Sequence, residues 1–152
     1  KADDGALWLI GEFGTVWRSM DLGQAWEPLD ALYEGTFFGA LPLAKGGAVV
    51  FGLRGNIFRS EDGAAWQRIE ISTNALLHGG ALLNDGRMVL SAGAGELLVS
   101  ENKGQSFSVI PLPDKAAVPI SLWHAGDGSL LVTTDRGIIR LEQPGLTKGT
   151  AQ

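Results

Sequence analysis

The sequence predicts an all-β fold built from a short antiparallel unit that recurs about every 40 residues. Four glycines close apolar runs at intervals of 41, 40 and 42 residues: Gly14, Gly55, Gly95 and Gly137. Each is followed by a second apolar run, and both runs have the length of a strand. A glycine with positive φ between two such runs favours a tight hairpin. No stretch keeps the 3.6-residue apolar period of a helix.

The strands are expected in the same order in every repeat. The central hairpins combine "ALWLIGEFG" with "TVWRS", "GAVVFGLRG" with "NIFRS", "RMVLSAGAG" with "ELLVS", and "SLLVTTDRG" with "IIRLE". A further run follows the hairpin, as in "AWQRIEI" and "SFSVIPLP". Another precedes it in the last three repeats: "TFFGALPLAKGG", "LLHGGALLNDG" and "PISLWHAGDG". Four strands in about 40 residues are typical of one blade of a β-propeller.

We therefore expect a β-propeller segment of about four four-stranded antiparallel blades over residues 1–142, with strands A to D running from the inner channel outward. The repeats are predicted at about 5–30, 31–72, 73–113 and 114–142, and a polar tail at 143–152. The first blade lacks strand A and the last lacks strand D, because no run precedes or follows them. Open strand edges favour association. We expect a larger ring, completed either by missing sequence or by another chain.

Composition narrows the function classes. The chain has 152 residues, about the length of one domain, and is 45% hydrophobic. Its net charge of −5 argues against a nucleic-acid partner, and no apolar run is long enough for membrane insertion. The absence of cysteine excludes disulfides and thiolate metal sites. We expect neither a cofactor nor a metal.

One motif recurs with the repeat: "RSMDLGQAW" begins at Arg18 and "RSEDGAAW" at Arg59. The motif is degenerate in the third repeat and absent from the fourth, where the spacing places Glu142 at the serine position. The carboxylate is expected to accept turn N–H groups, the glycine to adopt a left-handed conformation, and the tryptophan to pack between outer strands of neighbouring blades. A single carboxylate per turn makes a poor calcium site. The predicted structural residues are Ser19, Asp21, Gly23, Trp26, Ser60, Asp62, Gly63, Trp66, Ser100, Asn102, Gly104 and Phe107.

The Ser-x-Asp-x-Gly-x-x-Trp pattern resembles the Asp-box, or BNR repeat, of sialidase-like propellers. The phrases "GLRGNIFRSEDGAAW" and "VLSAGAGELLVSENKGQSF" look most like the photosystem II stability/assembly-factor-like family. The resemblance covers about residues 5–142. It implies a non-catalytic scaffold that binds a protein or peptide partner or assists complex assembly, and it favours an exported or periplasmic location.

The alternative is a glycoside hydrolase fragment of the sialidase or xyloglucanase type. The Phe-Arg-Ile-Pro motif of sialidases is absent. The neighbours Tyr33 and Glu34 would lie on opposite faces if they were on a strand, and a loop or edge position is the simpler interpretation of Tyr33. His78 and His124 lie on or near inner strands, where a packed or channel-lining histidine is the simpler interpretation. Nothing pairs two of the available carboxylates across a cleft, so we expect no catalytic residues. These carboxylates are Glu12, Glu34, Asp85, Asp127 and Asp135.

Two arginines are the candidate binding residues. Arg54 in "GLRGN" and Arg136 in "TDRGI" each precede a turn glycine between strands B and C. The B–C turns of a propeller share one face, so both side chains are expected near the channel mouth. Paired guanidinium groups could hold an anion or a peptide carboxylate. The alternative is that both are solvated turn residues.

Overall fold

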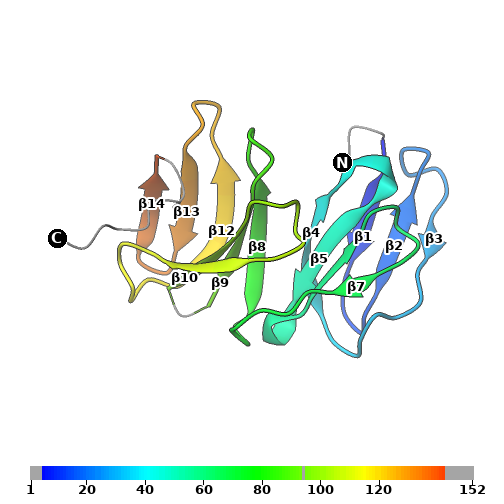
Figure 1. Ribbon diagram of the computed structural model, residues 1–152, viewed down its shortest axis with the longest axis horizontal. Coiled ribbons are helices and arrows are strands. Elements are labelled where there is room, and N and C mark those ends of the chain that lie inside the picture. The colour runs from blue at the N-terminus through cyan, green and yellow to red at the C-terminus, as the bar shows by residue number, and fades with distance from the viewer. Residues whose placement is uncertain (1–4, 94, 143–152) are drawn as a thin grey trace.

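The computed structural model describes residues 5–93 and 95–142, and these residues form four antiparallel sheets (Figure 1). The predicted tail at 143–152 lies outside them. The first sheet contains β1 (Leu7–Ile10), β2 (Val16–Ser19) and β3 (Glu27–Pro28). The second contains β4 (Phe37–Pro42), β5 (Ala48–Gly52), β6 (Ile57–Ser60) and β7 (Gln67–Arg68). The third contains β8 (Leu77–Leu82), β9 (Met88–Ala92), β10 (Glu96–Ser100) and β11 (Ser108–Pro111). The fourth contains β12 (Pro119–His124), β13 (Leu130–Thr134) and β14 (Gly137–Leu141).

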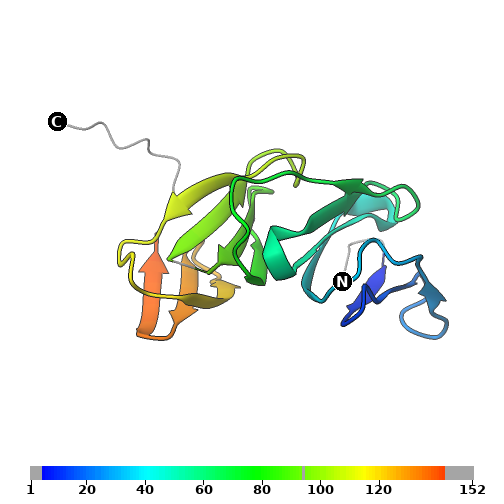
Figure 2. The same ribbon diagram turned by 90° about the horizontal axis from the view of Figure 1, so that it is seen from below.

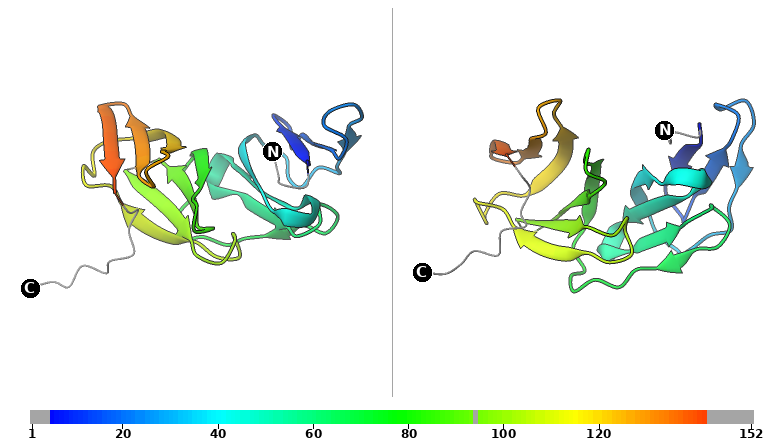
Figure 3. Two further views of the ribbon diagram at one scale, coloured as in Figure 1. Left: turned by 90° about the horizontal axis from the view of Figure 1, so that it is seen from above. Right: turned by 45° about the horizontal axis from the view of Figure 1, so that its top comes forward.

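Each sheet is a meander in which consecutive strands are hydrogen-bonded neighbours. Strands β4, β8 and β12 lie side by side along the inner edge, and β1 lies next to β4. The sheets follow one another in chain order around an open arc (Figures 2 and 3). The all-β prediction is confirmed, and so is the distribution of three, four, four and three strands over the described residues.

The hydrophobic core lies between the sheets. Phe37, Val50 and Phe58 pack the junction of the first and second sheets, and Leu122 and Val132 belong to the cluster joining the third and fourth. Strands β5 and β9 are buried along their whole length because neighbouring sheets cover both of their faces. Each sheet therefore buries its apolar surface mainly against its neighbours. This packing between sheets holds the connecting turns in fixed positions.

The connecting turns divide between two edges of the sheets. One edge carries the turns between β1 and β2, β5 and β6, and β13 and β14, at the bottom of Figure 1. The opposite edge carries the turns between β4 and β5, β8 and β9, and β12 and β13. Two of these turns contain a short 3₁₀ segment, η1 (Ala44–Gly46) and η2 (Leu53–Gly55). Among the described residues, no helix has the length and apolar character needed to cross a membrane.

The turn between β13 and β14 is one residue shorter than its counterpart in the second sheet. There, the amide of Gly52 donates to the carbonyl of Asn56 at 3.0 Å and encloses three residues. In the fourth sheet Thr134 pairs directly with Gly137, so only two residues form the turn. Gly137 therefore belongs to the strand ladder, whereas the glycine of η2 belongs to the turn.

The shorter turn shifts the strand register and corrects the spacing-based alignment. Ser19, Ser60 and Ser100 each pair with the first residue of the preceding strand. In the fourth sheet Leu141 makes that pairing, not Glu142. Counting five residues from each turn glycine aligns Glu142 with the serines, because such a count does not detect that the turn before Gly137 is one residue shorter.

Candidate functional site

Three turns contain the recurring serine motif, and we call them the Ser–Asp turns: residues 19–26, 60–66 and 100–107. In each, the buried serine hydroxyl accepts a hydrogen bond of 2.8 Å from the amide of the motif glycine. The same hydroxyl donates to the Asp or Asn side chain at 2.8 to 3.2 Å. One hydroxyl thus uses its donor and its acceptor to close the turn.

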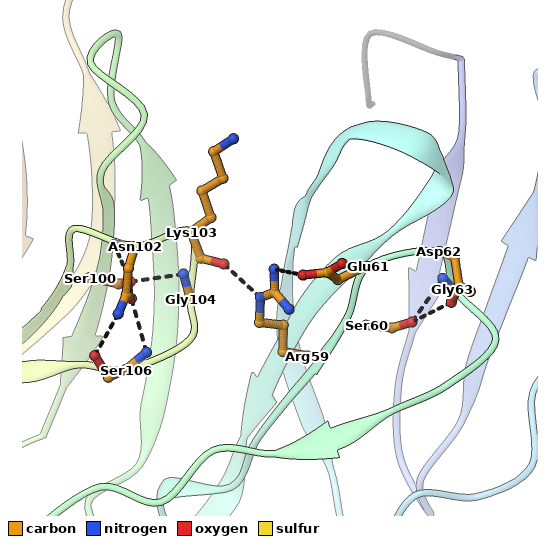
Figure 4. Close-up of polar contacts among 10 residues, drawn as sticks. All are labelled: Arg59, Ser60, Glu61, Asp62, Gly63, Ser100, Asn102, Lys103, Gly104 and Ser106. Carbon is orange, nitrogen blue, oxygen red and sulfur yellow. Dashed lines mark hydrogen bonds and ion pairs between the residues drawn. The ribbon is translucent and has the colours of Figure 1, made fainter.

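The Asp and Asn side chains accept further backbone hydrogen bonds, as the turn composition predicts. Asp21 accepts from the amide of Ala25 at 2.9 Å, and Asp62 accepts from Ala64 and Ala65. These bonds hold the pKa of both carboxyls below its ordinary value. Asn102 accepts from the amide of Ser106 at 3.0 Å, so the amide side chain keeps the same role without a charge (Figure 4). In both aspartates the hydrogen bonds converge on Oδ1, which is therefore engaged within the turn.

The motif glycines mark where each turn is pressed against the preceding sheet. Gly63 has φ of 78°, and a Cβ there would overlap the Arg18 guanidinium and the carbonyl of Gly46. A Cβ at Gly104 would meet the side chain of Val49. Both turns therefore need glycine for two reasons: the left-handed backbone and the absence of space for a side chain.

Arginines on β2 and β6 connect their sheets to the Ser–Asp turn of the next sheet. Arg18 Nη1 donates to the carbonyl of Asp62 at 2.8 Å, and Arg59 Nε donates to the carbonyl of Lys103 at the same distance (Figure 4). Each guanidinium also pairs with a carboxylate of its own sheet, at 3.3 Å and 3.0 Å respectively. We did not single these arginines out from the sequence, although the repeated "RS" before each motif could have indicated them.

The motif aromatics pack against neighbouring sheets where a preceding sheet is described. The Trp66 ring meets the edge of Trp8 of the first sheet, with centroids 5.5 Å apart. Phe107 packs on the cluster between the second and third sheets. Both residues therefore contact a neighbouring sheet, but Trp66 does so through Trp8 on β1 and not between outer strands. Trp26 is half-buried beside its own turn glycine, Gly23.

Arg54 and Arg136 both lie exposed on turns of the same edge, as predicted. They do not occupy the same hairpin position, since Arg54 lies in the three-residue turn and Arg136 in the two-residue turn. Arg54 has φ of 56°, whereas Arg136 is not among the residues with positive φ. Among the described residues, neither side chain forms an ion pair. Both guanidinium groups are accessible to a partner.

Phe13 belongs to the same edge and was not predicted. It occupies the Arg54 position in the turn between β1 and β2, has φ of 55° and is 85% exposed. A left-handed conformation is unusual for a bulky residue, and a fully solvated phenyl ring gains nothing for folding. Aligning "GEFGT" with "GLRGN" would have found it. We call the surface formed by Phe13, Arg54 and Arg136 the hairpin edge.

Three of the acidic residues considered for catalysis support turns. Asp85 pairs with Arg87 at 2.7 Å, and Asp127 accepts from Ser129 and Arg140. These partners lower the pKa of both carboxyls, whereas a glycosidase acid needs a raised pKa. Asp135 accepts a hydrogen bond of 2.7 Å from the amide of Val118.

The remaining candidates for chemistry are not assembled into a cluster. The Tyr33 hydroxyl donates to the carbonyl of Thr36, and burial raises the pKa of this phenol. His78 lies beside the ring of Phe38, with centroids 6.3 Å apart. Within residues 5–93 and 95–142, no three His, Asp or Glu side chains are grouped so that they could hold a metal.

Successive meander sheets around an arc, with inner strands adjacent, define a β-propeller, and the chain has this fold. It is similar to a structure of YCF48 bound to D1 peptide, with 19% identity, 91% of this chain and 49% of that chain covered, and a TM-score of 0.67. YCF48 from Cyanidioschyzon merolae is 22% identical, with 94% and 51% covered and a TM-score of 0.65. An ancestral GH74 enzyme is 14% identical, with 95% and 22% covered and a TM-score of 0.78.

This chain spans about half the length of the two YCF48 chains. No family model matches it, and no curated protein matches it. At these identities the likeness shows the propeller fold. The propeller fold occurs in both binding proteins and enzymes, so the function of this chain has to be argued from its side chains.

Proposed function

We propose that this chain is a non-catalytic propeller scaffold that binds a protein or peptide partner through the hairpin edge. The observation that carries the proposal is the exposure of one aromatic ring and two guanidinium groups on a single edge of packed sheets. Aromatic and arginine side chains are enriched at the centres of protein interfaces because they combine large contact areas with directed hydrogen bonds. A partner segment with an acidic group beside an apolar side chain matches this chemistry.

The serine motif supports the same proposal. We interpret the Ser–Asp turns as Asp-boxes of the photosystem assembly-factor-like kind, whose polar groups stabilise the scaffold. One oxygen of each carboxylate accepts backbone amides, which is the arrangement expected of a structural turn. The YCF48 structure that holds a D1 peptide makes peptide binding a reasonable proposal for a chain of this fold.

The glycoside hydrolase alternative receives support from the GH74 likeness alone. A hydrolase of that kind needs two carboxylates flanking one glycosidic bond, one of them with a raised pKa. In this chain Asp85 and Asp127 have lowered pKa values because of their arginine and serine partners. We therefore propose no turnover of β-glucans or sialosides.

Selection of peptides tests the binding proposal. A random peptide library displayed on phage is selected on the immobilised chain, and synthetic versions of the selected peptides are titrated by calorimetry. We expect enrichment of acidic residues next to apolar ones. The double change Arg54→Glu and Arg136→Glu should weaken binding by more than about tenfold, because attraction becomes repulsion.

The matched control is the double change Arg68→Glu and Lys45→Glu, which alters the net charge equally at exposed positions on the outer strand β7 and on the turn between β4 and β5 at the opposite edge. Equal loss in both variants would show a non-specific charge effect and reject the proposal. Selected peptides that bind the Arg54 and Arg136 variant as well as the wild type would also reject it. Hydrolysis of a β-glucan or sialoside would favour the enzyme alternative.

A further inference from the structure

A cavity opens between the second and third blades, on the edge opposite the hairpin edge. Its volume is about 360 Å³, within the range of pockets that hold small organic ligands. Pro42, Leu43 and Leu82 supply accessible apolar lining, and Lys45, Arg59 and Lys103 supply cations. We call it the interblade pocket. Its lining comes from the turn after β4, the end of β6, the turn before β9 and Lys103 of the third Ser–Asp turn.

The pocket has a counterpart at the first junction that differs in its side chains. There, Arg18 pairs in register with Trp8, whose ring lies 6.0 Å from the guanidinium carbon. At the second junction Arg59 pairs in register with Val49, which is too small to cover a guanidinium. Val49 is fully buried and is not part of the lining, whereas Arg59 lines the pocket.

The Arg59 guanidinium is held in place and still has a donor to offer. Its side chain is only 10% exposed, Nε donates to the carbonyl of Lys103, and Nη2 pairs with Glu61 at 3.0 Å. Figure 4 shows the guanidinium between the two blades, with Nη1 directed away from both of these partners. An arginine fixed by two partners loses little side-chain entropy when it binds a third group.

The charged residues of the pocket lining are mostly cationic, although the whole chain has a net charge of −5. Glu61 is the acidic residue of the lining, and Arg59 already pairs with it. Lys45 and Lys103 are exposed and form no ion pair among the described residues. Both lysines also have left-handed backbones, with φ of 60° and 57°, which fixes them on turns at the pocket rim. The two ammonium groups thus lack an acidic counterpart within the lining.

We propose that the interblade pocket binds a carboxylate attached to an apolar group. The carboxylate would meet Arg59 Nη1 and the lysine ammonium groups, and the apolar group would contact Pro42, Leu43 and Leu82. Charge-assisted hydrogen bonds of this kind are strong where water is partly excluded. Both a free aliphatic acid and the C-terminal residue of a peptide carry this chemistry. The site is independent of the hairpin edge.

Titration with defined probes tests the pocket. The probes are octanoate, the tetrapeptide Gly-Gly-Ala-Leu with a free C-terminus, and the same peptide with a C-terminal amide. Binding is followed by amide chemical shifts in ¹H–¹⁵N spectra and by calorimetry. We expect saturable shifts at the amides of Gly86 and Lys103, and affinity that falls as salt is raised. Octanoate alone would identify a free acid as the ligand source, and the free peptide alone a chain terminus.

Two variants make the test specific. Lys45→Asn and Lys103→Asn together should weaken carboxylate binding by about tenfold or more, and asparagine tolerates the left-handed backbone at both sites. Leu82→Asp should weaken it as well, because a carboxylate then replaces the apolar contact. The matched control, Arg68→Asn with Lys115→Asn, should bind like the wild type. Thermal unfolding of each variant confirms that the fold is kept.

Three results would overturn the proposal. The first is the absence of saturable binding by octanoate and by the free peptide. The second is equal binding of the amidated peptide, which would remove the carboxylate from the interaction. The third is equal affinity in the wild type and in the Lys45 and Lys103 variant, which would place the probes elsewhere on the molecule.

Discussion

The buried hydroxyl of Ser60 shows how one side chain closes a turn. It accepts from the amide of Gly63 at 2.8 Å and donates to Asp62 at 3.2 Å, and Ser60 is 1% exposed. In a Ser60→Ala variant the amide of Gly63 is left buried without an acceptor. We expect a loss of about 1–3 kcal/mol in the free energy of unfolding, measured by urea denaturation.

Ser108→Ala is the control for that experiment, because Ser108 is exposed on β11. A surface substitution of this kind should stay within about 0.5 kcal/mol of the wild type. Equal stability of the Ser60 and Ser108 variants would show that the serine hydroxyl is dispensable and would contradict the role given to the Ser–Asp turns.

The carboxylates of the first two Ser–Asp turns make stability depend on acid pH. Backbone hydrogen bonds hold the pKa of Asp21 and Asp62 below the ordinary value of 3.8, so folding favours their charged forms. This contribution is complete above the unfolded-state pKa and is lost as pH falls through the folded-state pKa. We expect the free energy of unfolding to decline as pH drops below about 4.

Asp21→Asn combined with Asp62→Asn should flatten that decline, and unfolding curves between neutral and strongly acid pH measure it. Asn102 already fills the same position in the third turn with its hydrogen bonds intact, which makes asparagine a suitable replacement. An unchanged acid limb in the double variant would assign the pH dependence to other carboxylates.

At the scale of the elements, the space around a turn glycine shows how closely its turn packs against the neighbouring blade. Gly63 and Gly86 both have positive φ, 78° and 86°, but only Gly63 has atoms where a Cβ would lie. Alanine at either position costs about 1–2 kcal/mol for the left-handed backbone. Gly63→Ala should lose additional stability because Arg18 and the Gly46 carbonyl must move.

The comparison of these two variants isolates the contact between blades. Thermal denaturation followed by circular dichroism should give a lower Tm for Gly63→Ala than for Gly86→Ala. A similar Tm for both would mean that the second Ser–Asp turn can withdraw from the first blade at little cost, and the packing role of the motif glycine would be rejected.

Element boundaries also show where a repeat pattern misleads. The spacing of the four glycines correctly predicted four hairpins. It assigned Gly137 to a turn, whereas the structure pairs Gly137 with Thr134 in the ladder. Loop length is not a periodic property, and one deleted residue changes the register of the strand that follows.

At the scale of the whole molecule, the fourth blade presents an uncovered apolar surface. Trp123 is 70% exposed and Ile138 is 71% exposed, and cross-strand register places Leu131 directly beside Trp123. The other blades bury such residues against a neighbour. Contiguous exposed apolar surface favours association. We expect the chain to associate at increasing concentration, as measured by sedimentation velocity.

Trp123→Thr combined with Ile138→Thr should shift that association to higher concentration, since threonine keeps the strand propensity and removes apolar area. Phe13→Asn is a suitable control because Phe13 is also highly exposed but lies on the hairpin edge, and asparagine tolerates its left-handed backbone. A monomer at every concentration, or equal association of both variants, would contradict the assignment of this surface.

The sequence by itself determined the features that local chemistry controls. The 40-residue spacing, the short apolar runs and the Ser-x-Asp motif predicted the β content, the blade number and the closed turns. These predictions succeeded because hairpins and Asx-type turns depend on a few consecutive residues. The exposure of Arg54 and Arg136 could also be predicted from the sequence, since turn positions between strands lie on the surface.

Only the tertiary structure decided what lies between blades. It placed Arg18 and Arg59 against carbonyls 44 residues further along the chain, and it opened the interblade pocket beside Arg59. It also brought Phe13 to the edge that carries Arg54 and Arg136. Such contacts depend on the volumes of side chains from different repeats and on the register of each hairpin. Close packing makes both sensitive to single residues that the repeat pattern does not distinguish.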